Sequence, residues 1–254
     1  MPSSKVKEWL EKTGVPLEME AASAFHREGF EVAQSYVYAD SQLEKSREID
    51  VYARDPDFLG VIDISFVLEC KASPKPWVVL KQSTGPIQYN MLHSFSLTSP
   101  AALKRLANRL FQTPIPEYVR AGSTAGYGIR QAFTDDGESS GAACIPLLKA
   151  GREIVRNNGV PKLPRHAFCF PALVVAAPLF ECSLLESGEL SISEVESSSF
   201  LLQAQIPQTI GCKVTIVTRS YLPTFAKQAR ELARTIRADW QSVQDAYFEP
   251  RSAA

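Results

Sequence analysis

Residues 48–71 read EIDVYARDPDFLGVIDISFVLECK, and this stretch decides the fold. Apolar and polar residues alternate within residues 48–53, and again over the whole of residues 61–71. A period of two is typical of a strand that buries one face. The residues between the two stretches include Asp-Pro-Asp and Gly60, which are typical of a turn. We therefore predict two strands that fold against each other as a hairpin.

The same alternation groups polar residues on one face of the second strand. Side chains two positions apart in a strand point the same way, so Glu69 and Lys71 lie side by side. Asp50 belongs to the first strand, on the face that it shares with Glu48. Whether Asp50 comes opposite Glu69 depends on the register of the hairpin, which the sequence leaves open.

A helix is expected before the hairpin. Leu17, Ala21, Ala24 and Phe25 recur at i, i+4, i+7 and i+8, which makes one apolar stripe that ends before Gly29. Glu18 lies at the edge of this stripe. A shorter helix is predicted over residues 3–12, and a strand over residues 30–38.

The rest of the chain is predicted to contain both helices and strands, and an α/β fold is expected. Helices are predicted at 101–111, at 139–157 with a kink at Pro146, and at 224–243. Strands are predicted at 167–177, 179–185, 190–195 and 213–219, the middle two as a hairpin. No repeat or low-complexity linker divides the 254 residues, so we predict a single domain.

Composition limits the classes of partner and compartment. The formal net charge of −1 provides no overall attraction to a polyanion, so DNA would need a local basic patch. The five cysteines are scattered, without a C-x-x-C pair, which favours a reducing, cytoplasmic location. No stretch reaches the length of a membrane span, and the first residues lack an apolar signal core, so no membrane partner is expected.

Asp50, Glu69 and Lys71 have the chemistry that phosphodiester hydrolysis needs. Carboxylates hold Mg²⁺ or Mn²⁺, and the cation neutralises the phosphate and activates water. A neighbouring ammonium group stabilises the negative charge that develops in the transition state. A Glu-x-Lys pair alone is usually a solvated ion pair. The coincidence of helix glutamate, strand aspartate, turn and Glu-x-Lys, in that order, is a much stronger signal.

The runs PLEMEAASAFHREGFEV (16–32), REIDVYA (47–53) and FVLECKAS (66–73) resemble the PD-(D/E)XK superfamily of nucleases. The likeness is closest to the Mrr-like and Holliday-junction-resolvase-like branches, and covers about residues 14–75. It implies a restriction-endonuclease-like mixed central sheet flanked by helices. Ile49 stands where the family name has proline, a position that varies.

The resemblance also implies roles for individual residues. Asp50, Glu69 and the main-chain carbonyl of Cys70 would bind the metal, and Lys71 would complete the catalytic set. Glu18 fits the helix-borne glutamate of the family better than Glu20 does.

A Mg²⁺-dependent DNA endonuclease of restriction, phage defence or repair is therefore expected. Its catalytic core would span about 14–110, with an elaboration over about 111–254 that matches no known module. The expected partners are DNA, and either a second copy of the chain or a protein that delivers the substrate. The alternative is an inactive module of the same fold that binds nucleic acid or a protein, because a fold alone does not confer activity.

A basic stripe on the last predicted helix has two interpretations. Lys227, Arg230, Arg234 and Arg237 are three or four residues apart, so they share one helix face. They could contact a phosphate backbone. They could also form a solvated face whose aliphatic stems cover the edge of the core. The second interpretation is favoured.

Overall fold

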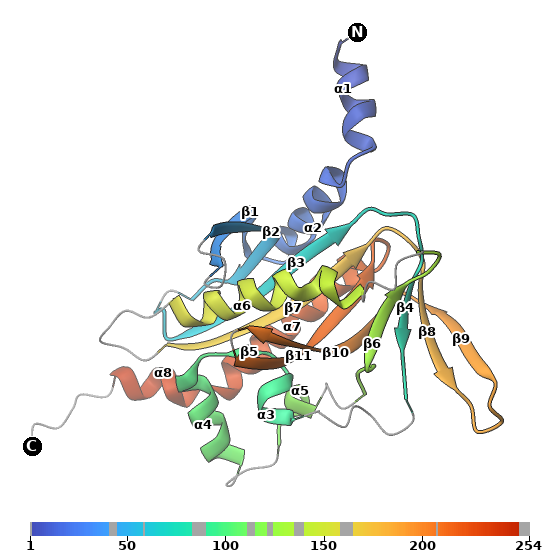
Figure 1. The fold of residues 1–254 in the computed structure, drawn as a ribbon. Helices are drawn as coiled ribbons and strands as arrows, with labels where there is room; N and C mark the ends of the chain where they lie inside the picture. The colour runs from blue at the N-terminus through green and yellow to red at the C-terminus, as the bar shows by residue number, and fades with distance from the viewer. Residues whose placement is uncertain are drawn as a thin grey trace, which may run out of the picture.

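The computed structural model describes residues 2–40, 45–57, 59–82, 90–110, 115–120, 124–134, 140–157, 165–206 and 208–248. Within them a large mixed sheet carries helices on both faces, and a smaller sheet lies at one side (Figure 1). The predicted α/β fold is confirmed.

Parallel strands form the centre of the large sheet. Its strands are β1 (Glu31–Asp40), β2 (Lys45–Asp55), β3 (Ile62–Lys71), β5 (Leu97–Thr98), β7 (His166–Val175), β10 (Ser197–Ile206) and β11 (Gln208–Thr218). Their order is β1-β2-β3-β7-β11-β10, with β5 paired to β7. The pairs β3–β7 and β7–β11 are parallel, and the outer pairs are antiparallel. Every position of β7 is buried, as expected for a central strand covered on both faces.

The smaller sheet has the order β6-β4-β8-β9. Its strands are β4 (Trp77–Leu80), β6 (Gly128–Gln131), β8 (Leu179–Leu184) and β9 (Leu190–Val195). The last two form the predicted hairpin, which projects from the body of the molecule (Figure 1). Strands β4, β6 and β10 were not among the predicted elements.

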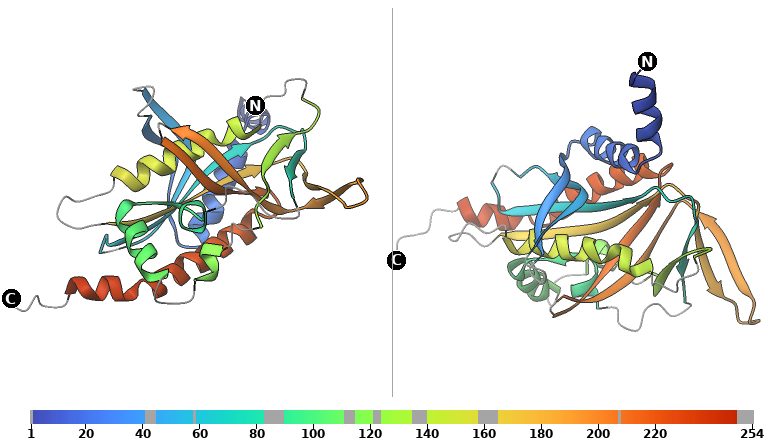
Figure 2. Two further views of the ribbon diagram at one scale, coloured as in Figure 1. Left: turned by 60° about the horizontal axis from the view of Figure 1, so that its bottom comes forward. Right: turned by 45° about the horizontal axis from the view of Figure 1, so that its top comes forward.

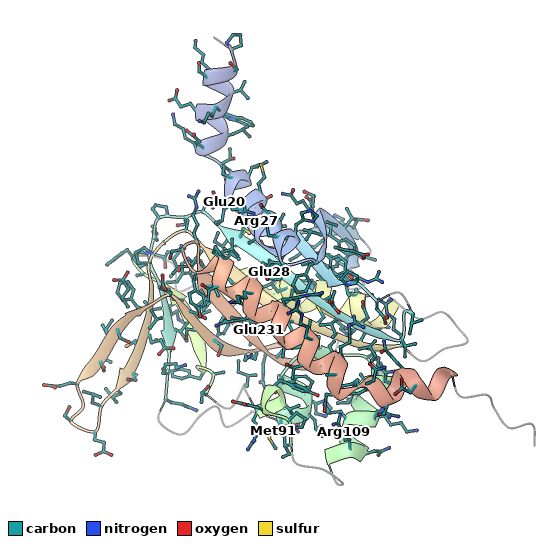
Figure 3. The ribbon with its side chains drawn as sticks, turned by 180° about the vertical axis from the view of Figure 1, so that it is seen from behind. Glu20, Arg27, Glu28, Met91, Arg109 and Glu231 are labelled. Carbon is teal, nitrogen blue, oxygen red and sulfur yellow. The ribbon has the colours of Figure 1, made fainter. Side chains whose placement is uncertain are left out.

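The helices form layers on the large sheet. They are α1 (Pro2–Glu11), α2 (Val15–Arg27), α3 (Met91–Ser94), α4 (Pro100–Leu110), α5 (Glu117–Arg120), the 3₁₀ helix η1 (Ser140–Cys144), α6 (Ile145–Asn157), α7 (Leu222–Asp239) and α8 (Gln241–Phe248). Helices α2 and α7 cover one face and α6 covers the other (Figure 2). Seen from behind, α7 crosses the whole face (Figure 3). None of the described helices is long and apolar enough to cross a membrane.

Two helix predictions needed correction. The helix expected at 139–157 starts only at Ile145, so Pro146 lies in its first turn, where proline fits without a kink. The helix expected at 224–243 is two helices, α7 and α8, which meet at Trp240. The indole of Trp240 is almost fully buried, and its ring packs on Phe168. This tertiary contact fixes the place where the helix breaks.

An aromatic cluster locks α2 to the β2–β3 hairpin. Phe25 of α2 lies 5.6 Å from the ring of Phe66 on β3, and 5.8 Å from Phe225 on α7. These rings belong to one of the two hydrophobic cores, and Val67, on the opposite face of β3, belongs to the other. Strand β3 is therefore clamped between two cores, which fixes the position of its polar end.

A glycine joins the two sheets. The backbone of Gly126 pairs with Phe200 of β10, and its amide donates to Ser199, 2.7 Å away. A Cβ atom at Gly126 would come within 2.6 Å of the main-chain oxygen of Leu80 on β4. Because a backbone oxygen cannot move aside without the strand, no side chain fits at this junction.

Gly126→Ala should therefore lower the free energy of unfolding by about 1–3 kcal/mol, the usual cost of overpacking. Urea denaturation monitored by circular dichroism measures the effect. Gly128→Ala is the matched control, because its added Cβ would lie 4.0 Å from the nearest atom, Cδ1 of Leu80. Equal urea midpoints for the two variants would contradict the expected clash.

Candidate active site

The β2–β3 hairpin brings Asp50 to the Glu-x-Lys segment. The predicted antiparallel pairing is confirmed, and its recorded register ends with Val51 opposite Leu68. Asp50 immediately precedes Val51, where this recorded pairing ends. The contact that the structure shows there is a hydrogen bond of 2.7 Å, which the backbone amide of Cys70 donates to Oδ2 of Asp50.

The neighbouring strand β1 is distorted at the same level. Pairs Gln34–Val51 and Tyr36–Ile49 flank a step at which Ser35 has a φ of 50°. A non-glycine residue in this left-handed region costs about 1–2 kcal/mol. Such distortions gather at functional sites, where the surrounding structure holds them in place. Here the distorted residue, Ser35, lies in β1 at the level of Asp50 in the adjacent strand β2.

Glu69 and Lys71 form an ion pair on one face of β3, as the alternation predicted. Nζ of Lys71 lies 2.7 Å from Oε1 of Glu69, and the two side chains are 33% and 13% exposed. Cys70, between them, turns to the other face and joins the hydrophobic core. Burial raises the pKa of the Cys70 thiol, so the sulfur stays protonated and is a poor metal ligand. The main chain of Cys70 is the part that can take part in the site.

Glu18 of α2 interacts electrostatically with charged residues at this end of β2 and β3. Burial raises the pKa of Glu18, and repulsion from Asp50 and Glu48 raises it further. Glu20 instead forms an ion pair with Arg219, whose Nε lies 2.6 Å from Oε2. Of these two glutamates of α2, Glu18 is therefore the one whose pKa is raised by the strand carboxylates, whereas Glu20 is paired with Arg219.

The carboxylates of the site raise one another's proton affinity. Burial raises the pKa of Asp50, although the hydrogen bond from Cys70 opposes the change. Burial also raises the pKa of Glu69, where the hydrogen bond from Lys71 acts against it and the charges of Asp50 and Glu18 add to it. Carboxylates held close together in a partly buried site repel one another, and a bound cation would reduce that repulsion.

Lys71 stays protonated in this environment. Burial by itself lowers the pKa of Lys71, but the hydrogen bond to Glu69 and the charges of Glu69 and Asp50 outweigh it, so the pKa is raised overall. The ammonium group can therefore donate hydrogen bonds at neutral pH, but it cannot act as a base.

Two further residues border the site without a signal in the sequence. The buried hydroxyl of Tyr38 has no hydrogen-bond partner among the described residues, and burial, with contributions from Asp40 and Glu69, raises its pKa to about 12. Burial raises the pKa of the Cys144 thiol to about 12 as well, and the charges of Glu69 and Lys71 also act on it. Cys144 comes from η1, far along the chain, so only the tertiary fold brings it here.

The donor set fits a magnesium-type ion better than zinc. Among the described residues, no group of three or more His, Cys, Asp or Glu side chains is placed to hold a metal ion. In this arrangement Asp50 accepts from Cys70, and Glu69 accepts from Lys71. Mg²⁺ commonly takes only one or two protein carboxylates and keeps several waters, so two acids and a carbonyl are enough.

The predicted basic stripe on α7 divides into two pairs. Arg230 and Arg237 form ion pairs with the buried carboxylate of Asp55, and Nε of Arg237 lies 2.5 Å from Oδ2. Lys227 and Arg234 are exposed. The first pair therefore holds α7 to β2, and only the second pair presents charge to solvent.

No family model matches the chain, and no curated protein or solved structure matches it.

Removing the charge of Glu18 should stabilise the metal-free protein. The raised pKa means that the folded state binds this proton more tightly than the unfolded state, so the charge destabilises the fold as pH rises through that pKa. We expect Glu18→Gln to raise the melting temperature at pH 7 by on the order of 1 °C or more. The difference should shrink as pH falls toward 4.5, the ordinary pKa of a glutamate side chain.

Thermal denaturation at several pH values, with a chelator present, measures this effect. Glu20→Gln is the control on the same helix, because it removes a carboxylate that is paired with Arg219. A Glu18→Gln protein that is no more stable than wild type at pH 7 would contradict the repulsion.

Proposed function

We propose that this protein is a Mg²⁺- or Mn²⁺-dependent deoxyribonuclease with a PD-(D/E)XK site. One observation carries the proposal: the Asp50 carboxylate accepts a hydrogen bond from the amide that lies between Glu69 and Lys71. This contact supports the proposal because it joins the two strands that carry the residue types the chemistry needs. The resemblance in residues 14–75 supports the same assignment.

Asp50, Glu69 and the carbonyl of Cys70 would hold the cation. When bound, the cation neutralises the scissile phosphate and lowers the pKa of a water molecule. Lys71 remains an ammonium group, so its part is to donate hydrogen bonds to the attacking water or to a phosphate oxygen as negative charge develops. Glu18, with its raised pKa, retains a proton more readily than an ordinary glutamate and supports the site from α2.

Binding of DNA has to be local. The net charge of −1 gives no general attraction. Lys227 and Arg234 are the exposed members of the α7 stripe, on the sheet face opposite Glu69 and Lys71, so they would contact only DNA that extends around to α7. A role in restriction, phage defence or repair is part of the proposal.

A cleavage assay tests the function. Supercoiled, linear, branched and single-stranded DNA are incubated with the protein in Mg²⁺, in Mn²⁺ or in a chelator. We expect cleavage of at least one substrate only with the metal, and its loss in Asp50→Asn.

One observation favours the inactive module instead: no three-residue metal group is preformed among the described residues. DNA binding without cleavage in either metal would support that module and refute the nuclease.

A further inference from the structure

A half-buried lysine lies on the face of the large sheet opposite the candidate active site. Lys213 stands in β11 opposite Leu201 of β10, and it lines a cavity of about 200 Å³ beneath α7. Phe66, Phe170 and Phe225 also line the cavity. Phe66 belongs to the face of β3 that packs on α2 and α7, whereas Glu69 and Lys71 point away from it.

The ammonium group of Lys213 has no partner in the described part of the structure. None of the residues that line the cavity is acidic. Among the described residues, Nζ of Lys213 takes part in none of the recorded ion pairs or side-chain hydrogen bonds, and the cation–π contact found there joins Arg230 to Phe30. Burial lowers the pKa of Lys213. Lys213 is half-buried, and an ammonium group beside an apolar wall loses part of its hydration, which is costly without a counter-charge.

A structural role accounts poorly for this lysine. Lysine stems often cover apolar surface while the head group reaches water. Lys213 lines the cavity beside three phenylalanines, and burial lowers its pKa, so its head group is less well hydrated than that of a surface lysine. A methionine or leucine would fill the same space without the cost of the charge. The position therefore has the features of a ligand site, where stability is given up for binding.

The cavity wall suits a flat apolar group. The rings of Phe66 and Phe170 stack 5.2 Å apart at 26°, and Phe225 meets Phe66 edge-on at 6.4 Å and 86°. Two polar side chains, Thr215 and Gln228, also line the cavity. Gln228 donates to the hydroxyl of Tyr221 at 2.9 Å, so α7 itself holds this amide in place.

We propose that this cavity binds a small molecule with an aromatic or similarly flat apolar body and a single carboxylate. The carboxylate pairs with the Lys213 ammonium group, with the hydroxyl of Thr215 as a further donor. The apolar body lies against Phe66, Phe170 and Phe225. This site does not depend on the nuclease proposal, because it shares no residue with it.

Phenylacetate is the probe, and benzyl alcohol is its neutral counterpart. At about 10 mM, phenylacetate should raise the melting temperature of the full-length protein by about 3 °C if Kd is near 1 mM. Benzyl alcohol should have a much smaller effect. Lys213→Met should melt higher than wild type without ligand, and should not respond to phenylacetate. The control Lys104→Met removes an exposed lysine of α4, and it should respond as wild type does.

A second measurement does not depend on the folding of a variant. Reductive ¹³C-methylation labels the lysines of the wild-type protein, and one dimethylamine resonance should titrate below the others and move when phenylacetate is added. An absent response to phenylacetate would overturn the proposal. So would an equal response to benzyl alcohol, or an unchanged response in Lys213→Met.

Discussion

Lys71→Ala is expected to reduce metal-dependent DNA cleavage by about 100-fold or more, the usual result of removing one donor that stabilises transition-state charge. The ion pair of 2.7 Å with Glu69 holds the ammonium group at the end of β3, and the raised pKa keeps it charged. Its removal takes away a donor and leaves the carboxylates in place. Single-turnover cleavage in Mg²⁺, with enzyme in excess, measures the chemical step.

Lys75→Ala is the matched control, because Lys75 is exposed and lies just beyond the strand. Its cleavage rate should equal that of the wild type. Equal losses in the two variants would point to a general effect on charge or folding. An undiminished rate in Lys71→Ala would remove Lys71 from the catalytic set.

Asp55→Ala is expected to lower the free energy of unfolding by about 3–5 kcal/mol, the typical cost of breaking a buried ion pair from one side. Asp55 is 3% exposed and binds both Arg230 and Arg237 of α7. Without it, two guanidinium groups that are mostly covered lose their counter-charge. Urea denaturation at pH 7 measures the loss.

The exposed Asp245 of α8 provides the control, and Asp245→Ala should change stability by less than about 0.5 kcal/mol. A triple variant, with Asp55, Arg230 and Arg237 replaced by Leu, Met and Met, should recover most of the loss, because no buried charge remains. A loss below about 1 kcal/mol in Asp55→Ala would show that the two arginines find water instead.

Local patterns in the sequence predicted the elements that carry the site. The alternation in 61–71 and the stripe of Leu17, Ala21 and Phe25 are short-range signals, and both segments form the predicted strand and helix. The hairpin followed from the turn residues between its strands. Its register did not, because register depends on the packing of both faces of the sheet.

Elements without a strong local pattern were missed. Strand β10 reads SSSFLLQAQI, whose polar residues and lack of alternation obscure an edge strand. Strands β4 and β6 have four residues each, too few for a period to emerge. The break at Trp240, the left-handed Ser35 and the approach of Cys144 to Lys71 arise from contacts between distant segments.

Ion pairs with distant residues also give different roles to residues that look alike in the sequence. Glu18 and Glu20 differ because Arg219 engages only the second. The four basic residues of α7 differ because Asp55 binds two of them. Each of these partners lies far away in the chain, and no spacing rule could have identified them.

Titration of Mn²⁺ into the metal-free protein, followed by isothermal calorimetry, examines whether Asp50 and Glu69 hold one cation together. The proposed function predicts one Mn²⁺ site in the wild type and in Glu20→Gln. Asp50→Asn and Glu69→Gln should each weaken that site by at least about 10-fold. Equal Mn²⁺ affinity in the wild type and both of these variants, or no Mn²⁺ binding by the wild type, would contradict a shared metal site.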